Sequence, residues 1–499
     1  MHEKNLKFRY APPKASAMVE ALRGLGYSLP TALADVIDNS ISAKAKLINI
    51  QFIWGGLKSK IIISDNGSGM TDVELDSAMR LGEKNPLDTR SQDDLGRFGL
   101  GLKTASFSQC RRLTVASKKN SKVSCLRWDL DVLSKSVDDG WKLLEGPADG
   151  SEEIFIPLES TQSGTLVVWE VLDRIVTNNF KEQDFLDLID KVDKHLSMVF
   201  HRYITGPVSK IKISINDEYL KPWDPFFTSH SATWSSPISE IRTDSGIISL
   251  RGYVLPHKDR LTLAEYDLMA GPDGWTAQQG FYIYRNERLL VSGSWLGLGK
   301  GKSWTKEEAH RLSRIQIDIP NTADSDWKID VRKSVARPPV QIRDRLIRLA
   351  EDARERARRV FAHRGQIVRS NSGDKLLQAW YPENFSGGLR YKIDLQHPVI
   401  KGVLEESGML KKDIEIMLRV IEETIPIQRI WLDTSEQKET PRNAFGGQNQ
   451  DSIMSVLIVV YKNLVIKKGF SVRLAKDQLR NMEPFNGFPT LIESLPDIS

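Results

Sequence analysis

The sequence has very few cysteines and lacks the features that define several large protein classes. Only Cys110 and Cys125 occur among 499 residues, too few for a disulfide framework, so we expect a reducing, cytoplasmic location. The eight histidines are scattered, and no Cys/His spacing suggests a metal cage. No apolar run is long enough to span a bilayer, and the first residues lack the apolar segment of a signal peptide. We therefore expect neither a secreted nor a membrane-spanning protein.

The chain also has little excess charge of either sign. The formal net charge is +5 over the whole chain, which permits a nucleic-acid partner but does not argue for one. The 40% hydrophobic and 27% charged fractions are those of an ordinary globular protein. At this length the chain exceeds the usual limit of one core, so we expect roughly two to four domains.

Apolar periodicity divides the chain into three units. Residues 1–205 contain strand-like runs, among them "EEIFIPL" at 152–158, together with several helical segments, an order that predicts an α+β two-layer domain. Residues 206–366 form a second α/β unit, which begins with the strand-like "SKIKISIND" and ends in an arginine-rich helix. After a short low-complexity linker, residues 372–499 form a small, mixed helical unit.

A short helix near the start has an unusual polar face. In "ADVIDNSISA", at 34–43, helical geometry gathers Leu33, Ala34, Ile37 and Ile41 on one side and Asp35, Asp38, Asn39 and Ser42 on the other. Two carboxylates and an amide on one side of a helix with an apolar back suggest a site rather than only a solvated surface.

A strand then ends in "DNGSGM" at 65–70. A carboxylate fixed at a strand end, Asp65, can accept a hydrogen bond from an amino group, and glycines let a flat ligand approach the backbone. A tight turn explains the same letters without a ligand.

A glycine-rich stretch follows, "GRFGLGLKTASFS" at 96–108. Gly96, Gly99 and Gly101 precede a helix, where backbone N–H groups could cradle phosphates, and Lys103 could add a counter-charge. A flexible loop with a helix cap is the alternative. The stretch is not a Walker loop, because it lacks the G-K-[ST] ending.

The order of these motifs, followed by "SGTLVVW", resembles the GHKL ATPases, which include gyrase B subunits, heat-shock chaperones of the ninety-kilodalton class, histidine kinases, MutL and MORC proteins. The resemblance implies a Bergerat-type two-layer α/β sandwich that binds ATP and Mg²⁺. It implies that Asp65 binds the adenine amino group, that Asn39 coordinates the metal, and that Thr165 supports Asp65. It further assigns adenine contacts to Gly67, Gly69 and Met70, and phosphate contacts to Gly96, Gly99 and Gly101.

The resemblance also implies a general base. Hydrolysing members usually carry glutamate where this chain has Asp35, one methylene shorter. A positioned carboxylate need only reach the attacking water, so catalysis remains possible. Asp38 is the alternative base, although we expect it to be a solvated helix carboxylate or a structural hydrogen-bond acceptor.

The second unit resembles the transducer domain of such ATPases, and "QGFYIYRNERLL" at 279–290 resembles a MORC strand. In these families a loop sends a Lys or Arg to the γ-phosphate. Lys333 is our choice of this second catalytic residue, with Arg332 and Arg337 as alternatives and a surface-exposed basic loop as the interpretation without a site.

Prokaryotic MORC-like ATPases resemble most of the first 365 residues. The resemblance implies a homodimer closed by ATP through N-terminal contacts, and the basic helix from Arg343 to Arg364 suggests a DNA clamp in a role such as phage defence or repair. The alternative is a chaperone-like or signalling switch that acts on a protein partner through residues 372–499. The aromatic residues of "AWYPENFSGGLRY" are a docking surface or a local core.

Overall fold

The chain folds into two compact units, Met1–Ala357 and Arg358–Ser499, each of which we describe by itself. The structure is a computed structural model. It describes residues 9, 13–83, 101–135, 140–205, 210–324, 326–330, 333, 335–361, 377–385, 388–427, 430, 450–482, 485 and 488–497. Within these residues, no helix is both long enough and apolar enough to cross a membrane.

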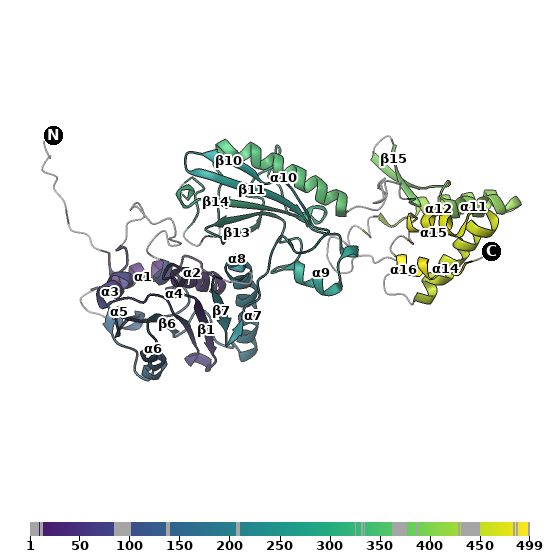
Figure 1. The fold of residues 1–499 in the computed structure, drawn as a ribbon. Coiled ribbons are helices and arrows are strands. Elements are labelled where there is room, and N and C mark those ends of the chain that lie inside the picture. The colour runs from purple at the N-terminus through teal and green to yellow at the C-terminus, as the bar shows by residue number, and fades with distance from the viewer. Residues whose placement is uncertain are drawn as a thin grey trace, which may run out of the picture. The chain divides into compact units, whose positions relative to one another are not determined.

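A mixed sheet forms the first layer of the unit Met1–Ala357 (Figure 1). Among the described residues it has eight strands in the order β5-β4-β3-β6-β2-β1-β7-β8. Strands β1 and β7 are parallel, and the other neighbours are antiparallel. The strands are β1 (Leu47–Ile53), β2 (Lys60–Asp65), β3 (Arg112–Lys119), β4 (Lys122–Asp129), β5 (Leu144–Glu145), β6 (Gly164–Glu170), β7 (Lys212–Ile215) and β8 (Glu218–Tyr219).

Most helices of this part cover one face of the sheet. Alternation along β2 sends Ile61 and Ile63 into a core shared with the helices, whereas Ile62 faces the opposite side. This α+β arrangement is the predicted fold class. The helices of this part are α1 (Ala15–Arg23), α2 (Leu29–Ser42), α3 (Asp72–Met79), α4 (Gly101–Phe107), α5 (Leu130–Lys135), α6 (Ile156–Ser160), α7 (Glu182–Val199) and α8 (His201–Ile204).

The strand expected at 152–158 is wrong. Glu152–Phe155 is a 3-10 helix that continues into α6, and Phe155 and Leu158 bury against the sheet face that carries Ile62. The reason is Pro157, which has no N–H for a strand ladder but fits the first turn of a helix.

The first sheet continues past residue 205. Strand β7, in the segment expected to open the second unit, pairs with β1 from Leu47↔Lys212 to Ile50↔Ile215. The turn to β8 then adds the last strand of this sheet among the described residues.

A second sheet has the strand order β10-β11-β14-β12-β13, with β9 paired to β11. Helix α10 lies along it (Figure 1) and packs Ile342, Leu346, Ala350 and Ala353 into the same core as the strands. The elements are β9 (Trp234–Ser235), β10 (Ser239–Thr243), β11 (Gly246–Val254), α9 (Leu263–Ala270), β12 (Gly280–Arg285), β13 (Arg288–Ser294), β14 (Ser313–Ile319) and α10 (Val340–Phe361).

The unit Arg358–Ser499 is mostly helical around a small core that includes Leu457, Tyr461 and Leu479. Its aromatic motif forms a hairpin in which Tyr381 and Tyr391 are exposed. The elements are β15 (Trp380–Phe385), β16 (Gly388–Ile393), α11 (Pro398–Glu406), α12 (Lys411–Glu423), α14 (Gln450–Lys462), α15 (Val472–Arg480) and α16 (Pro489–Glu493).

Candidate functional site

A cavity of about 230 Å³ lies against α2 and the ends of β2 and α3, and it gathers most of the predicted site residues. Gly67 adjoins this group through its contact with Asp65. Gly96 and Gly99 lie outside the described residues. The predicted residues that line the cavity are Asp35, Asp38, Asn39, Asp65, Gly69, Met70, Gly101, Lys103, Thr165 and Lys333.

Helix α2 supplies the floor of this cavity. The Ser28 hydroxyl accepts a hydrogen bond from Thr31 N, and Pro30 occupies the first turn, so the helix starts where the sequence predicts. Leu33 and Ile37 are fully buried on the apolar side. The two carboxylates of the polar side are buried too, because Asp35 and Asp38 are only 4% and 2% exposed, whereas Asn39 on the same side is exposed. Of the two roles expected for Asp38, burial therefore excludes the solvated carboxylate and leaves the structural hydrogen-bond acceptor.

Asp35 is held at both carboxylate oxygens. The Tyr27 hydroxyl donates to Oδ2 at 2.9 Å, and Lys333 Nζ donates to Oδ1 at 2.9 Å. Burial, reinforced by the charge of Asp35, raises the pKa of Tyr27 well above its usual value, so this hydroxyl stays a donor. The carboxylate is thus oriented toward the cavity by a neutral group and a cation.

Asp38 is enclosed by two cations. Lys333 Nζ donates to Oδ2 at 2.5 Å, and Arg288 Nε lies 3.2 Å from both oxygens. Burial alone would raise the pKa of Asp38, but the charges and hydrogen bonds of Arg288 and Lys333 outweigh it and lower the pKa below the usual value. A carboxylate with a lowered pKa is a poor proton acceptor, which favours the structural role of Asp38 over the role of base.

Arg288 was missed by the sequence interpretation. It begins β13 directly after a two-residue turn, Asn286-Glu287, in which both residues have positive φ. The turn directs Arg288 to Asp38, 250 positions earlier in the chain, and its Nη2 also lies 3.7 Å from Asp35 Oδ1. The only sequence signal was a charged residue at the start of the apolar run "LLV".

Lys333 reaches the cavity from the segment before α10. It is 9% exposed, and its φ of +54° is uncommon for a residue with a side chain. Arg337, one alternative, is exposed and does not line the cavity. Arg332, the other, lies outside the described residues. Of the three basic residues considered, Lys333 is the one that the described structure brings to Asp35.

Asp65 lies at the end of β2 with two close donors. Ser40 Oγ donates to Oδ2 and Gly67 N donates to Oδ1, each at 2.8 Å. Burial raises the pKa of Asp65, and this rise is only partly opposed by the Gly67 N–H, the Ser40 hydroxyl and the Thr165 N–H. The carboxylate is therefore fixed in direction and poorly solvated.

The glycines after Asp65 are required by the packing of the backbone. Gly69 has a φ of +64°, and a Cβ there would lie 1.9 Å from the Lys118 carbonyl oxygen. A Cβ on Gly67 would lie 2.9 Å from Ala43, just after α2. The turn "DNGSGM" thus presses against both α2 and β3.

Thr165 supports this region through a hydroxyl chain. Its Oγ1 lies 2.9 Å from Ser117 Oγ, and Ser117 Oγ accepts from Met70 N at 2.8 Å. Thr165 also pairs with Asp65 across β2 and β6. Ser117, in β3, is a second residue that sequence reasoning missed, since its register beside Thr165 is set by the sheet.

Lys103 and Gly101 lie on α4, next to α2. The ammonium of Lys103 donates to the Ala78 carbonyl at 2.8 Å, near the end of α3, and the side chain is buried. A Cβ on Gly101 would lie 3.9 Å from Asp35 Oδ2, so the start of α4 approaches Asp35 closely.

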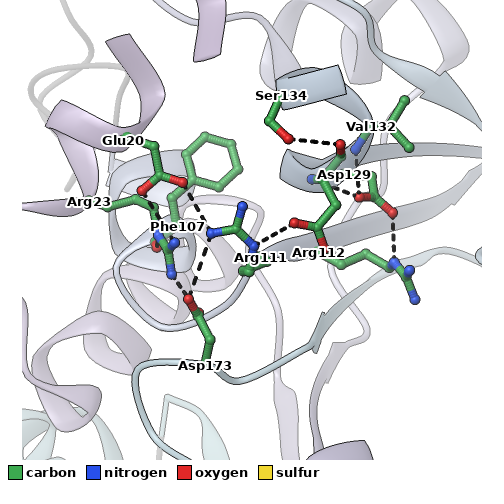
Figure 2. Close-up of polar contacts among 10 residues, drawn as sticks. Glu20, Arg23, Phe107, Arg111, Arg112, Asp129, Val132, Ser134 and Asp173 are labelled. Atoms are coloured by element: carbon green, nitrogen blue, oxygen red, sulfur yellow. Dashed lines mark hydrogen bonds and ion pairs between the residues drawn. The ribbon is translucent and has the colours of Figure 1, made fainter. Parts of the chain in front are cut away.

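A polar network anchors the far end of α4 (Figure 2). The buried Arg23 donates from Nε to the Phe107 carbonyl at 2.8 Å and from Nη2 to Asp173 at 2.5 Å. Arg111 connects Glu20 and Asp131 to the same group. The network ties α1 and α5 to the carbonyl that ends α4.

Comparison with known proteins gives a family match to the same region. The model of the family "Histidine kinase-, DNA gyrase B-, and HSP90-like ATPase" matches residues 27–165. The mouse protein "ATPase MORC2B" is 29% identical over 139 residues, 27% of this chain and 12% of that protein. The Caenorhabditis elegans protein "ATPase morc-1" is 28% identical over 96 residues, 19% of this chain and 11% of that protein. The chain thus spans only about a tenth of either relative's length.

Proposed function

Because residues 27–165 match the model of the histidine kinase-, gyrase B- and HSP90-like (GHKL) ATPase family, we propose that this chain binds ATP with Mg²⁺ in the α2 cavity and hydrolyses it to ADP and phosphate. One observation carries the proposal. Lys333, outside the matched region, makes an ion pair with Asp35 in the same cavity that Asp65 lines. One cavity therefore contains a hydrogen-bond acceptor that can bind the adenine amino group, a carboxylate that can take a proton from water, and a cation that can contact the terminal phosphate.

Asp65 binds the adenine amino group in this proposal. Its two oxygens already accept hydrogen bonds from Ser40 and Gly67, so the direction of their remaining lone pairs is set before adenine binds. Because burial removes competing water, a hydrogen bond from an amino group to this carboxylate is favourable and directional. Met70 and Val167, which also line the cavity, supply apolar surface for the purine.

Asn39 offers the metal-binding atom. Its Nδ2 donates to the Asp35 carbonyl oxygen at 3.0 Å, which leaves Oδ1 as the atom available to a hard cation. Within the described residues, no group of three or more His, Cys, Asp or Glu is arranged to hold a metal. In this proposal the ion would be held by the Asn39 amide oxygen and the phosphates of the nucleotide. When bound, Mg²⁺ neutralises developing charge on the phosphates.

Asp35 acts as the general base. Its carboxylate takes a proton from water while the water oxygen forms a bond to the γ-phosphorus and the bond to the β–γ bridging oxygen breaks. The electron pair of that bond leaves on ADP. Lys333, now paired with Asp35, faces the γ-phosphate oxygens and stabilises their charge. Tyr27 keeps Asp35 oriented.

The test is equilibrium binding of MgATP together with phosphate production, in wild type and Asp65→Asn. We expect wild type to bind and hydrolyse ATP, and the variant to lose at least about 100-fold in affinity, because the Asn amide presents a donor to the adenine amino group. Asp76→Asn, at an exposed carboxylate paired with Arg80, is the matched control and binds as wild type. Equal affinity in Asp65→Asn would contradict the proposal.

We propose further that ATP closes the ATPase domains of two copies into a clamp that acts on DNA, in a MORC- or MutL-like defence or repair role. Support comes from α10, where Arg345 and Arg348 are exposed, whereas Arg354 is buried between Trp295 and Trp304 and is structural.

Salt-titrated binding to duplex DNA tests this role. Replacing Arg345 and Arg348 by Gln together should reduce the slope of log affinity against log salt by about 2, because each phosphate contact contributes about 0.9. The exposed Lys302→Gln is the control. No DNA binding with or without ATP would favour the alternative, a switch that acts on a protein partner. That alternative is supported by the apolar side chains that α12 exposes, namely Ile416, Met417, Val420 and Ile421.

A further inference from the structure

A second cavity, of about 310 Å³, shares Lys333 with the first. Residues of α7, the start of α2 and β13 enclose it. Lys306 is exposed, so the cavity opens to solvent at that residue. Its lining consists of Thr31, His195, Met198, Val199, Arg288, Leu289, Leu290, Val291, Ser292, Gly293, Ser294, Lys306 and Lys333.

The charges around this cavity are one-sided. Arg288, Lys306 and Lys333 line it together with His195, and the described residues that line it include no Asp or Glu. The carboxylates that pair with Arg288 and Lys333, Asp35 and Asp38, line the first cavity instead. The two carboxylates of this ion-pair cluster thus line the first cavity, Arg288 lines the second, and Lys333 lines both.

Burial acts on two ionisable groups that line this cavity. Burial and the charge of Arg288 lower the pKa of His195 to about 4, so the imidazole is neutral near pH 7. Burial also lowers the pKa of Lys306.

The backbone of β13 contributes donors. Among the described residues it is the last strand on its side of the second sheet, so alternate main-chain N–H groups point away from β12. Ser292, partly buried on this strand, adds a hydroxyl. Ammonium, guanidinium, hydroxyl and amide donors together are the groups that bind a tetrahedral oxyanion.

We propose that the second cavity binds inorganic phosphate and receives the phosphate produced in the first cavity, an inference that rests on the proposed ATPase function for its source of phosphate. Lys333 lines both cavities. Its ammonium, which faces the γ-phosphate in the first cavity, therefore stays in contact with the released phosphate as the phosphate moves into the second cavity. Arg288, released from part of its interaction with Asp38, is the next cation on the route.

Direct binding tests the site without turnover. Calorimetric titration of the full chain with inorganic phosphate is performed with a non-hydrolysable ATP analogue present, which fills the γ-phosphate position of the first cavity, and again without it. We expect phosphate to bind in both conditions. Lys306→Met, which removes a rim charge, and Ser292→Leu, which fills the cavity, should each weaken binding about tenfold. Lys302→Met, at an exposed lysine outside the lining, binds as wild type.

The outcomes separate the two proposals. Phosphate binding that is absent, or equal in all variants, overturns the second site whatever the chain does with ATP. Failure of the analogue to bind would count against the proposed function alone, because the titration without analogue still tests the cavity. If phosphate binds, the release step is measured in a single turnover, comparing ATP cleavage by acid quench with free phosphate from a fluorescent phosphate sensor. Release that lags cleavage more in Lys306→Met than in Lys302→Met supports the route, and an equal lag contradicts it.

Discussion

At the scale of single residues, the two aspartates of α2 differ in their partners. Asp35 has a neutral donor, Tyr27, on one oxygen and Lys333 on the other. Asp38 has Arg288 on both oxygens and Lys333 on one of them. Two cations lower the proton affinity of Asp38 and hold it in an ion pair. Residues from β13 and the segment before α10 therefore favour our proposal that Asp35, rather than Asp38, is the base.

Asp35→Asn should lose about 100-fold or more in turnover, because the amide cannot accept a proton from water. ATP affinity should stay within about threefold of wild type, since binding is assigned to other residues. Asp35→Glu, which restores the family's usual residue, should retain measurable turnover. Phosphate production and calorimetry measure the two quantities. Turnover at the wild-type rate in Asp35→Asn would show that another group is the base.

Asp65 illustrates a conflict between stability and binding. Because the pKa of Asp65 is raised by folding, the folded state favours the protonated form, and this stabilisation is present below the ordinary pKa and lost as pH rises through the raised value. Asp65→Asn, which is always neutral, should therefore unfold at the same or a higher temperature than wild type near pH 7. Its advantage should shrink as pH is lowered toward about 4. A variant that is clearly less stable at neutral pH would contradict this reading.

The sequence reveals some of these residues and hides others. Asp35 and Asn39 follow from helical spacing, and Asp65 follows from a strand end before glycines. Tyr27, Ser117 and Arg288 leave no such signal, because their roles depend on tertiary neighbours. The contact between Arg288 and Asp38 bridges 250 positions, and no local pattern encodes it.

At the scale of elements, α4 depends on a distant anchor. It has seven residues, too short to be stable by itself, and its last carbonyl is bound by the buried Arg23.

Arg23→Met should lower the free energy of unfolding by about 3 kcal/mol, because the Phe107 carbonyl and Asp173 both lose a partner. Denaturant unfolding measures it. Arg80→Met, which removes an exposed pair with Asp76, is the control and should cost less than about 0.5 kcal/mol. Equal effects of the two substitutions would show that the network in Figure 2 contributes no more to the free energy of unfolding than an exposed ion pair does.

Element prediction succeeds where one local signal dominates. Helix α2 has Pro30 in its first turn and a periodic apolar face, and β2 has an apolar run that ends at Asp65. The strand predicted at 152–158 is wrong because Pro157 cannot donate to a strand ladder and fits the first turn of a helix, although the apolar residues around it favour a strand. The attachment of β7 to the first sheet could not be predicted, because "KISI" has the same pattern whichever sheet it joins.

At the scale of the whole molecule, the cluster of Asp35, Asp38, Arg288 and Lys333 links two separate hydrophobic cores. A ligand that changes the partner of Lys333 must alter this link. We expect a non-hydrolysable ATP analogue with Mg²⁺ to double the molar mass measured by light scattering, and ADP to leave it unchanged. An unchanged mass with the analogue would contradict ATP-driven dimerisation without affecting the assignment of the site.

We propose above all that Lys333, from outside the matched ATPase region, contacts the γ-phosphate of a nucleotide bound next to Asp35 and thereby distinguishes ATP from ADP. Calorimetry tests it most directly when ATP and ADP affinities are compared in Asp35→Asn, which prevents turnover, with and without Lys333→Met. We expect ATP to bind more tightly than ADP only when Lys333 is present, and ADP affinity to be the same in both proteins. An ATP preference that survives in Lys333→Met would contradict it.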